Sequence, residues 1–335
     1  MTRYLTRRLI LLLPVLLGIS VLTFSIMQIL PGDPVMIMLQ GQTHTPEEVE
    51  KIRAQWGLDQ PPVLQYLNYA AQLVVGDFGR SFMLQQPVLP VLLQHLPATI
   101  ELAVTSIVFA LLIAIPLGVI SAIKQHSWID KFATIVAILG ISMPGFWVGL
   151  LLIIVFAVTL GVLPVSGRLE YAVGLDEVTG FYVLDSLLTG NLAAFADALA
   201  HLAMPAFVLG TSMAAHTTRL VRSSMLEVAR QDYVNCARSK GLSERIVVAR
   251  HMLANALIPT VTIVGIQAGT ILGGAIVIET IFAWPGLGRL TVQAIGARDY
   301  FLLQGIVLVF AVTRVGFNVL TDVLYAVIDP RIRFS

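Results

Sequence analysis

Side chains that could carry catalysis are sparse in this sequence, and the spacings that common catalytic motifs require are missing. A phosphate-binding Walker A loop needs a Gly-Lys pair, so that backbone amides and the lysine together surround the phosphates. The lysines follow other residues: Lys51 follows Glu, Lys124 Ile, Lys131 Asp and Lys240 Ser. Neither a His-Glu-x-x-His zinc motif nor a Gly-x-Ser-x-Gly nucleophile elbow occurs. Cys236 is the only cysteine, which excludes an internal disulfide and argues against a cysteine-based metal site. The sequence predicts a chain with no catalytic residues, cofactor or metal of its own.

The most informative polar stretch is residues 222–258, which lies between two apolar runs. Residues 231–241 predict a short helix capped by Asp232 and ended by Gly241. Ser243 is then expected to cap a second helix. Such a helix–glycine–helix elbow, held against a membrane, could insert into a cleft of a soluble partner and transmit the partner's motion. A basic loop that only sets membrane topology is the alternative interpretation.

Few ionisable residues lie inside the apolar runs, among them Glu101, His216, Glu279 and Arg314. Glu101 follows Thr99 at an expected helix start, where a carboxylate is favoured by the helix dipole, so we expect a structural role. His216 is expected to pack between helices. An arginine inside a membrane is costly and faces protein or water, so we expect Arg314 to pair with a partner subunit. A secondary transporter, the alternative class, commonly shows internal repeats and midplane ionisable groups.

Composition places these residues in a membrane. The chain has 335 residues, 57% hydrophobic and 12% charged, whereas soluble domains carry about 25% charged residues. About 20 apolar residues cross a hydrocarbon core about 30 Å thick. We therefore expect an all-α membrane protein with six transmembrane helices, the third kinked at Pro144-Gly145. The expected spans are approximately 9–30, 99–123, 132–162, 202–221, 257–282 and 301–327.

The distribution of Lys and Arg orients these spans. The first apolar run is longer than a signal-peptide core and has no small-x-small cleavage site after it, so we expect a retained span. Of the 21 Lys and Arg residues, 14 fall on the side of the two termini, 6 on the other side, and Arg314 within the last span. The positive-inside rule therefore predicts that both termini are cytoplasmic.

Three parts of the chain follow: an N-terminal tail and first span (1–30), an outer segment (31–98), and a five-span core (99–335). The outer segment is expected to fold, because Thr45-Pro46-Glu47-Glu48 forms a capping box before a helix that Gly57 ends. A second helix should end at Gly76. Both would be amphipathic, facing a membrane surface or a partner; packing on the outer ends of the spans is the alternative. The apolar faces comprise Val49, Ile52 and Trp56, then Leu64, Leu67, Ala71 and Val74.

Residues 233–243, followed by His251 and by Asn255-Ala256-Leu257-Ile258-Pro259, resemble the coupling loop of a known family. This family comprises the permeases of binding-protein-dependent ABC importers, in their dipeptide and oligopeptide branch. The general family signature is Glu-Ala-Ala, three residues, then Gly. Here Asn235-Cys236-Ala237 stands at the same distance from Gly241, so the acidic residue is missing.

Further motifs resemble the same branch along the whole chain, in order and on the predicted sides of the membrane. The stretches 179–181 and 184–185 most resemble dipeptide permeases. The remaining motifs are at 30–34, 76–79, 222–227, 279–289, 298–300 and 329–333.

The resemblance implies the type I ABC importer permease fold and a role in carrying di- or oligopeptides across a bacterial inner membrane. Glutathione, nickel complexes or another small metabolite are alternative substrates. The implied partners are a second, related permease, two ATPase subunits that bind ATP and Mg²⁺, a periplasmic solute-binding protein and the lipid bilayer; no nucleic acid is expected. The ATPase-coupling candidates are Asp232, Tyr233, Ala237, Arg238, Lys240, Gly241, Leu242 and Ser243. Candidates for partner or pore contacts are Glu279, Trp284 and Arg314.

Two of these coupling candidates have specific expected roles. The small Ala237 is expected on the contact face of the elbow. Gly241 is expected to hold a left-handed helix stop.

Overall fold

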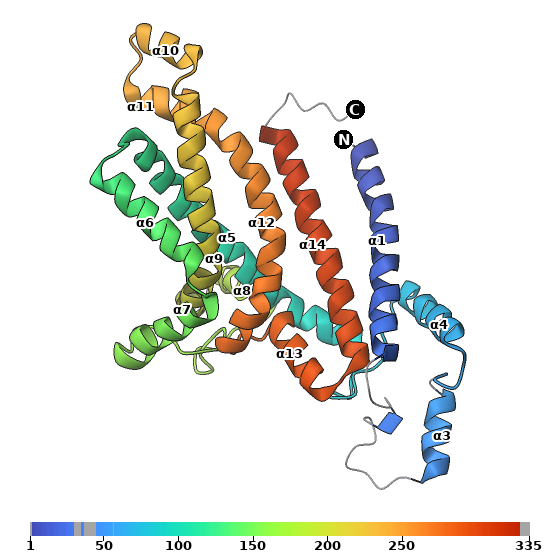
Figure 1. Cartoon of the computed structure of the whole chain (residues 1–335). Helices are drawn as coiled ribbons and strands as arrows, with labels where there is room; N and C mark the ends of the chain where they lie inside the picture. The colour runs from blue at the N-terminus through green and yellow to red at the C-terminus, as the bar shows by residue number, and fades with distance from the viewer. Residues whose placement is uncertain (1, 30–34, 37–44, 56, 329–335) are drawn as a thin grey trace. The chain divides into compact units, whose positions relative to one another are not determined.

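Figure 1 shows the computed structural model of the chain, which describes residues 2–29, 35–36, 45–55 and 57–328. Within these ranges the regular structure is helical, apart from one isolated bridge between Arg80 and Pro87. The chain divides into two compact units, residues 1–96 with 290–315, and residues 97–289 with 316–335. The motifs at 30–34 and 329–333, and Trp56, lie outside the described residues.

The first unit contains helices α1 (Thr2–Ile29), α3 (Pro46–Gln55) and α4 (Pro62–Val74). Helix α4 packs on α1 through aromatic rings: the Tyr66 ring centroid lies 5.5 Å from that of Phe24, and the Tyr66 hydroxyl lies 3.0 Å from the hydroxyl of Ser20. Leu64, Leu67 and Val74 of α4 stay exposed. The structure therefore supports the packing role of α4, and it leaves uncovered most of the face predicted to meet a membrane surface or a partner.

The start of α3 follows directly from its sequence. The main-chain N–H of Thr45 donates to Oε2 of Glu48 at 2.9 Å, and the main-chain N–H of Glu48 donates to Oγ1 of Thr45 at 3.3 Å. These reciprocal bonds satisfy donors that a helix start leaves free, so the predicted capping box is formed. Gly57 has a φ of +62° shortly after the helix ends, as a glycine stop requires.

Asp299 joins two motifs of the first unit that are far apart in sequence. One of its carboxylate oxygens accepts hydrogen bonds from the hydroxyl of Ser81 at 2.6 Å and from the main-chain N–H of Met83 at 2.9 Å. The other accepts from the N–H of Leu302 at 3.1 Å and so caps α14 (Tyr300–Ile328). Asp299 is fully buried, so the motif at 298–300 holds the loop that follows the motif at 76–79.

In the second unit, α9 (Leu192–Val228) packs along α12 (Ala254–Ile281), and α6 (Trp128–Ser142) and α7 (Gly145–Leu152) pack on α9. Helix α5 begins in the first unit and continues into the second, whereas α13 runs from the second into the first. The remaining bounds are α5 (Val88–Ile123), η1 (Ile153–Thr159), α8 (Tyr182–Leu188), α10 (Asp232–Ser239), α11 (Glu244–Ile246), η2 (Val247–Leu253) and α13 (Leu287–Ala297); η1 and η2 are π-helical.

The described residues contain four helices long and apolar enough to cross a membrane: Val88–Ile123, Leu192–Val228, Glu244–Ile281 and Tyr300–Thr321. A fifth crossing exists if α6 and the following Gly145–Thr159 form one broken span, which bends by 105°. The predicted kink at Pro144-Gly145 is in the structure a full break between two helices. The described apolar stretch of α1, Leu13–Ser25, is shorter than a span. The chain is an all-helical membrane protein, and its six-span count stays a prediction.

Two helix boundaries differ clearly from the predicted spans. Helix α5 begins at Val88 rather than near Thr99, and α9 covers Leu192–Val228 rather than 202–221. Each contains a proline, Pro97 in α5 and Pro205 in α9. Prolines are tolerated inside membrane helices because neighbouring groups satisfy the backbone that they free. Apolar length therefore located the spans but not the helix ends.

Candidate functional site

The predicted elbow is formed by α10 and α11, which lie beyond the ends of α9 and α12 in the second unit (Figure 1). Its turn depends on Gly241, whose φ is +76°. The N–H of Gly241 donates to the carbonyl of Arg238 at 2.9 Å, and the N–H of Leu242 donates to the carbonyl of Ala237 at 3.4 Å. This pair of bonds is the Schellman motif, which satisfies the last carbonyls of a helix. The predicted left-handed stop is confirmed.

An ion pair joins the two helices across this turn. The Arg238 guanidinium donates to both carboxylate oxygens of Glu244, at 2.8 and 3.2 Å. Arg238 lies in α10 and Glu244 begins α11, so the bidentate contact fixes the angle between them. Both side chains are exposed, at 38% and 57%, so the pair stabilises the elbow only modestly.

The inner face of the elbow is apolar and buried. Val234 and Ala237 of α10 pack in one cluster with Val221 and Met225 of α9 and with Val247 of η2. Because Ala237 is only 6% exposed, the prediction that it lies on the contact face is wrong. Its small side chain instead lets α10 lie close to the helices beneath it.

The outer face of the elbow presents other residues to solvent. Tyr233, Leu242 and Ile246 are 43%, 38% and 45% exposed. Lys240 and Arg238 are also exposed. Exposed apolar side chains close in sequence to exposed charged ones can serve as a protein contact surface. Tyr233 and Leu242 were predicted to take part in coupling; Ile246 was not among the predicted residues, although it lies only three residues after Ser243.

Two predicted helix caps are only partly present. Gln231 occupies the N-cap position of α10, and Asp232 is the first residue inside the helix, where its charge still favours the helix dipole. Ser243 does occupy the N-cap position of α11, but its side chain makes no capping hydrogen bond. Its carbonyl accepts from the N–H groups of Ile246 and Val247 instead.

A buried carboxylate anchors the helix that leads into the elbow. Asp130, 4% exposed, accepts two hydrogen bonds from the Arg222 guanidinium at 2.7 and 2.8 Å. It also accepts from the Ser121 hydroxyl and from the main-chain N–H of His126. Asp130 thereby ties the end of α5, the start of α6 and the last turns of α9 together. Sequence reasoning identified the motif beginning at Arg222 but not its partner, which lies 92 residues earlier.

Glu279 and Trp284 belong to a second buried network in the same unit, which we call the clamp (Thr99, Glu279, Trp284 and Arg289). The Thr99 hydroxyl donates to Glu279 at 2.7 Å, and the N–H of Arg289 donates to it at 3.0 Å. The Trp284 indole donates to the carbonyl of Ala98 at 2.8 Å. Glu279 and Trp284 are 0% and 1% exposed, so their contacts are internal. This burial corrects the expectation of direct partner or pore contacts.

Glu101 and Arg168 form a buried ion pair, each 6% exposed. The Arg168 guanidinium also stacks 3.7 Å from the Tyr182 ring centroid, and the N–H of Val183 donates to Glu101 at 2.8 Å. The expectation that Glu101 lies at a helix start is wrong, because α5 begins at Val88. Its role is structural for a different reason: it holds the segment around α8 against α5.

Asp185 organises the stretches 179–181 and 184–185. It accepts hydrogen bonds from the Thr179 hydroxyl at 2.6 Å and from the N–H groups of Val178, Thr179 and Gly180. Burial raises the pKa of the Asp185 carboxyl, but these hydrogen bonds together lower it below its ordinary value. The two short stretches that most resemble dipeptide permeases are therefore joined by one ionised carboxylate.

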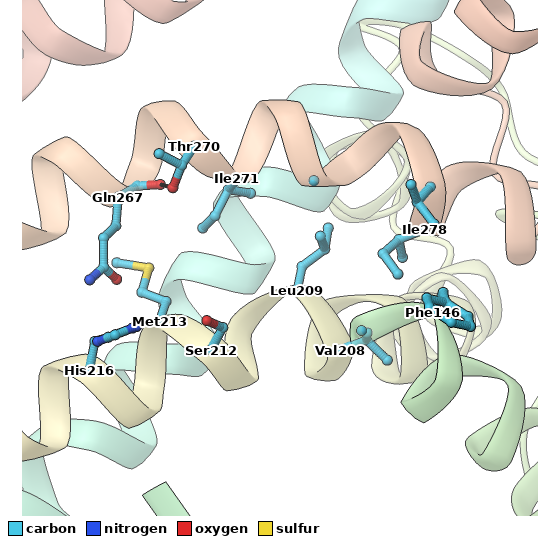
Figure 2. Close-up of a pocket in the computed structure, with 13 residues that line it drawn as sticks. Phe146, Val208, Leu209, Ser212, Met213, His216, Gln267, Thr270, Ile271 and Ile278 are labelled. Atoms are coloured by element: carbon cyan, nitrogen blue, oxygen red, sulfur yellow. Dashed lines mark hydrogen bonds between the residues drawn. The ribbon is translucent and has the colours of Figure 1, made fainter. Parts of the chain in front are cut away.

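A cavity of about 480 Å³ lies between α7, α9 and α12 (Figure 2). His216 and Met213 of α9 face Gln267 of α12 near one end, and Phe146 and Ile278 lie at the other. His216 was expected to pack between helices; it lines this cavity instead. No local pattern predicted the cavity, because its lining comes from three helices far apart in the chain.

Arg314 is exposed on α14. Its pairing with another subunit stays a prediction.

Comparison with known proteins identifies the family to which this chain is similar. Residues 114–334 match the family model "Binding-protein-dependent transport system inner membrane component", and residues 1–105 match the model for the N-terminal part of such components. The chain is 44% identical to the dipeptide transport system permease protein DppB of Escherichia coli K12, over 99% of both chains. It is 43% identical to the di/tripeptide transport system permease protein DppB of Pseudomonas aeruginosa, again over 99% of both.

The inward-facing MetNI methionine ABC transporter has a similar fold. The TM-score is 0.54 at 16% identity, covering 71% of this chain and 96% of the compared chain. The family models and the dipeptide permease relatives identify the chain as a permease of the ABC importer class. The chain belongs to the family of binding-protein-dependent transport system inner membrane components. It is accordingly a multi-pass inner-membrane protein, and its family works with ATPase and binding-protein partners.

Proposed function

We propose that this chain is the pore-forming permease subunit of an ATP-driven importer that carries di- and oligopeptides across the inner membrane. The chain is 44% and 43% identical to two dipeptide permeases over nearly the full length of each, which supports this substrate class. We also propose that the chain crosses the membrane six times, with both termini in the cytoplasm. The chain itself hydrolyses nothing; ATP and Mg²⁺ bind to two partner ATPase subunits.

The elbow couples the ATPases to the pore. The observation that carries this assignment is its two-sided construction: Tyr233, Leu242 and Ile246 are exposed on one side, whereas Val234 and Ala237 are packed on α9 and η2 on the other. A force on the exposed side is therefore passed to α9 directly and to α12 through η2, which runs into it without a break. Asp130 and Arg222 stiffen the end of α9 that receives this force.

The proposed cycle needs two permeases that enclose one pathway. ATP binding closes the ATPase pair, draws the two elbows together and opens the pathway outward; hydrolysis lets it relax inward. An external solute-binding protein delivers the substrate and sets most of the choice among ligands. Glutathione, nickel complexes or another small metabolite would use the same machinery with a different binding protein.

The coupling proposal is tested by Tyr233→Ala, with Tyr171→Ala as the matched control, because Tyr171 is a fully exposed tyrosine outside the elbow. Peptide uptake and ATPase stimulation by loaded binding protein are measured in proteoliposomes. Loss of an aromatic anchor from a protein contact typically costs a factor of about ten or more, so uptake by Tyr233→Ala should fall by about that factor. Wild-type uptake and stimulation in both Tyr233→Ala and Leu242→Asp would contradict the assignment.

Energy dependence separates the proposed importer from an ion-coupled secondary transporter. Uptake that requires ATP and persists in the presence of an ionophore supports the proposal. Uptake that collapses with the ionophore and needs no nucleotide would support the alternative class.

Orientation is tested with single cysteines in a Cys236→Ala background, since Cys236 is exposed and would react itself. A cysteine at Gln60 should react with an impermeant thiol reagent from outside the cell. A cysteine at Ser243 should react only after permeabilisation. The reverse pattern would overturn both the orientation and the coupling assignment.

A further inference from the structure

The cavity between α7, α9 and α12 contains a polar group that the chain leaves unused. The side-chain oxygen of Gln267, Oε1, is buried, yet none of the described residues donates a hydrogen bond to it. A buried acceptor without a donor is unfavourable, and more so inside a membrane, where water is scarce. Gln267 lines the cavity, so a rotation of its amide lets Oε1 receive a donor from outside the chain.

The neighbouring groups are polar but uncharged. Ser212 and His216 of α9 line the same cavity, and Figure 2 shows the His216 ring and the Gln267 amide on facing helices. None of the described residues that line the cavity is an Asp, Glu, Lys or Arg. The lining therefore suits an uncharged part of a ligand, and the charged ends of a ligand must lie outside it. It offers donors and acceptors side by side, because a glutamine amide carries both.

The size and remaining lining of the cavity also limit the ligand. A volume of about 480 Å³ falls within the 300–1,000 Å³ typical of small-ligand sites. Most of the wall is apolar, including Val208, Leu209, Ile271 and Ile278. A small molecule with one amide group and variable apolar side chains matches such a wall.

We propose that Gln267, with His216 and Ser212 beside it, binds the main-chain amide of a peptide in transit. The site rests on the proposed function and identifies which part of the substrate the permease contacts. Gln267 Oε1 accepts the peptide N–H, while the neighbouring Ser212 or His216 donates to the peptide carbonyl. An amide is common to all peptides, so the site accepts any sequence, and neutral partners hold the peptide weakly enough to release it.

The test compares two substrates that differ by one group. Alanyl-alanine has a peptide N–H; alanyl-lactate has an ester oxygen there, with the same charged ends and nearly the same shape. Uptake of each is measured with the complete complex and one binding protein in proteoliposomes. The quantity of interest is the ratio of the two uptake rates, because discrimination by the binding protein is the same for every permease variant and cancels.

Gln267→Met keeps the side-chain length but removes the amide. The matched control is Thr270→Val, another cavity residue, whose hydroxyl is already bonded to the main-chain carbonyl of Gln267 at 2.7 Å. We expect Gln267→Met to slow alanyl-alanine uptake about fivefold, the loss of one neutral hydrogen bond, with alanyl-lactate uptake nearly unchanged. Thr270→Val should leave the ratio as in the wild type, and ATPase stimulation should be normal in both variants.

Three results would overturn the site. An equal loss for both substrates would mean that Gln267 contacts another subunit or ordered water. Unchanged uptake of both compounds in Gln267→Met, or an equal change of the ratio in Thr270→Val, would mean that the amide is not recognised here. A wild-type complex that responds to its binding protein but imports neither compound would overturn the proposed function itself, which separates that failure from failure of the site.

Discussion

The elbow and the clamp each depend on a glutamate, but in opposite environments. At the clamp, Glu279 is fully buried and its oxygens accept hydrogen bonds from Thr99 and Arg289. At the elbow, Glu244 is 57% exposed and makes one ion pair with Arg238. A buried carboxylate must have every partner in place, whereas an exposed one is solvated if its partner leaves. The clamp is therefore built to stay fixed, and the elbow can adjust when another protein binds it.

Glu279→Ala should have the largest effect. It leaves the Thr99 hydroxyl and the Arg289 N–H without their acceptor in a buried site, at a cost of about 3 kcal/mol or more. The midpoint of thermal unfolding of the purified complex should fall by several degrees. Glu279→Gln keeps one acceptor oxygen, so its midpoint should fall clearly less. Equal midpoints for wild type and Glu279→Ala would mean that the clamp is not a stabilising element.

Ala237→Asp should come second, with its damage confined to the elbow. The new carboxylate enters the apolar cluster around Val221 and Met225, at a local cost of about 2–3 kcal/mol, limited because α10 can move away. Limited trypsin digestion at Lys240 and Arg245 should become faster, while the melting midpoint of the membrane helices stays unchanged. Ser239→Asp places the same charge at an exposed position of the same helix, so trypsin should cleave this variant at the wild-type rate. Rapid cleavage of both variants would show that charge alone loosens the elbow.

Gly241→Val should weaken the elbow by about 1–2 kcal/mol, because a β-branched residue is strained at a φ of +76°. No described atom lies near the position of the added Cβ, so backbone strain is the only cause. Gly241→Asn tests this point, since asparagine tolerates the left-handed region. Trypsin should cleave the valine variant faster than the asparagine variant, and identical rates would exclude strain as the cause.

Glu244→Gln should have the smallest effect, about 0.2–1 kcal/mol, because the lost ion pair is exposed. Its contribution should also be screened by salt. The difference in trypsin cleavage rate between wild type and variant should be measurable at low ionic strength and disappear at about 1 M salt. A difference that persists at high salt would indicate that the contact acts by geometry rather than by charge.

How far the sequence predicted these regions depends on the distance between interacting residues. The Gly241 stop and the Thr45 capping box were predicted correctly, because both are made within a few residues. The burial of Ala237 was not, since it is set by Met225 and Val247 on other helices. The ion pair of Glu101 was missed for the same reason: its partner Arg168 lies 67 residues away, beyond any local pattern.

The membrane helices show the same division. Apolar runs located the helices in the chain, and a Pro-Gly pair correctly marked the break after α6. The start of α5 was missed because residues 88–98 are less continuously apolar and contain Pro97, which usually signals an end. The cavity residues Ser212 and Gln267 were not predicted, because the local sequence of an apolar helix does not indicate which of its sides faces a neighbouring helix.

The π-helical segment η2 has a consequence for how this chain can change over evolution. A wider turn of this kind accommodates an extra residue within an otherwise regular helix. Because the wide turn takes up the extra residue locally, removing one residue from Val247–Leu253 would restore the narrower helix and leave the elbow nearly in register with α12. Such a deletion would shorten the chain without re-aiming Tyr233 or Leu242. The root of the elbow can thus gain or lose one residue among relatives while the direction of the elbow is kept.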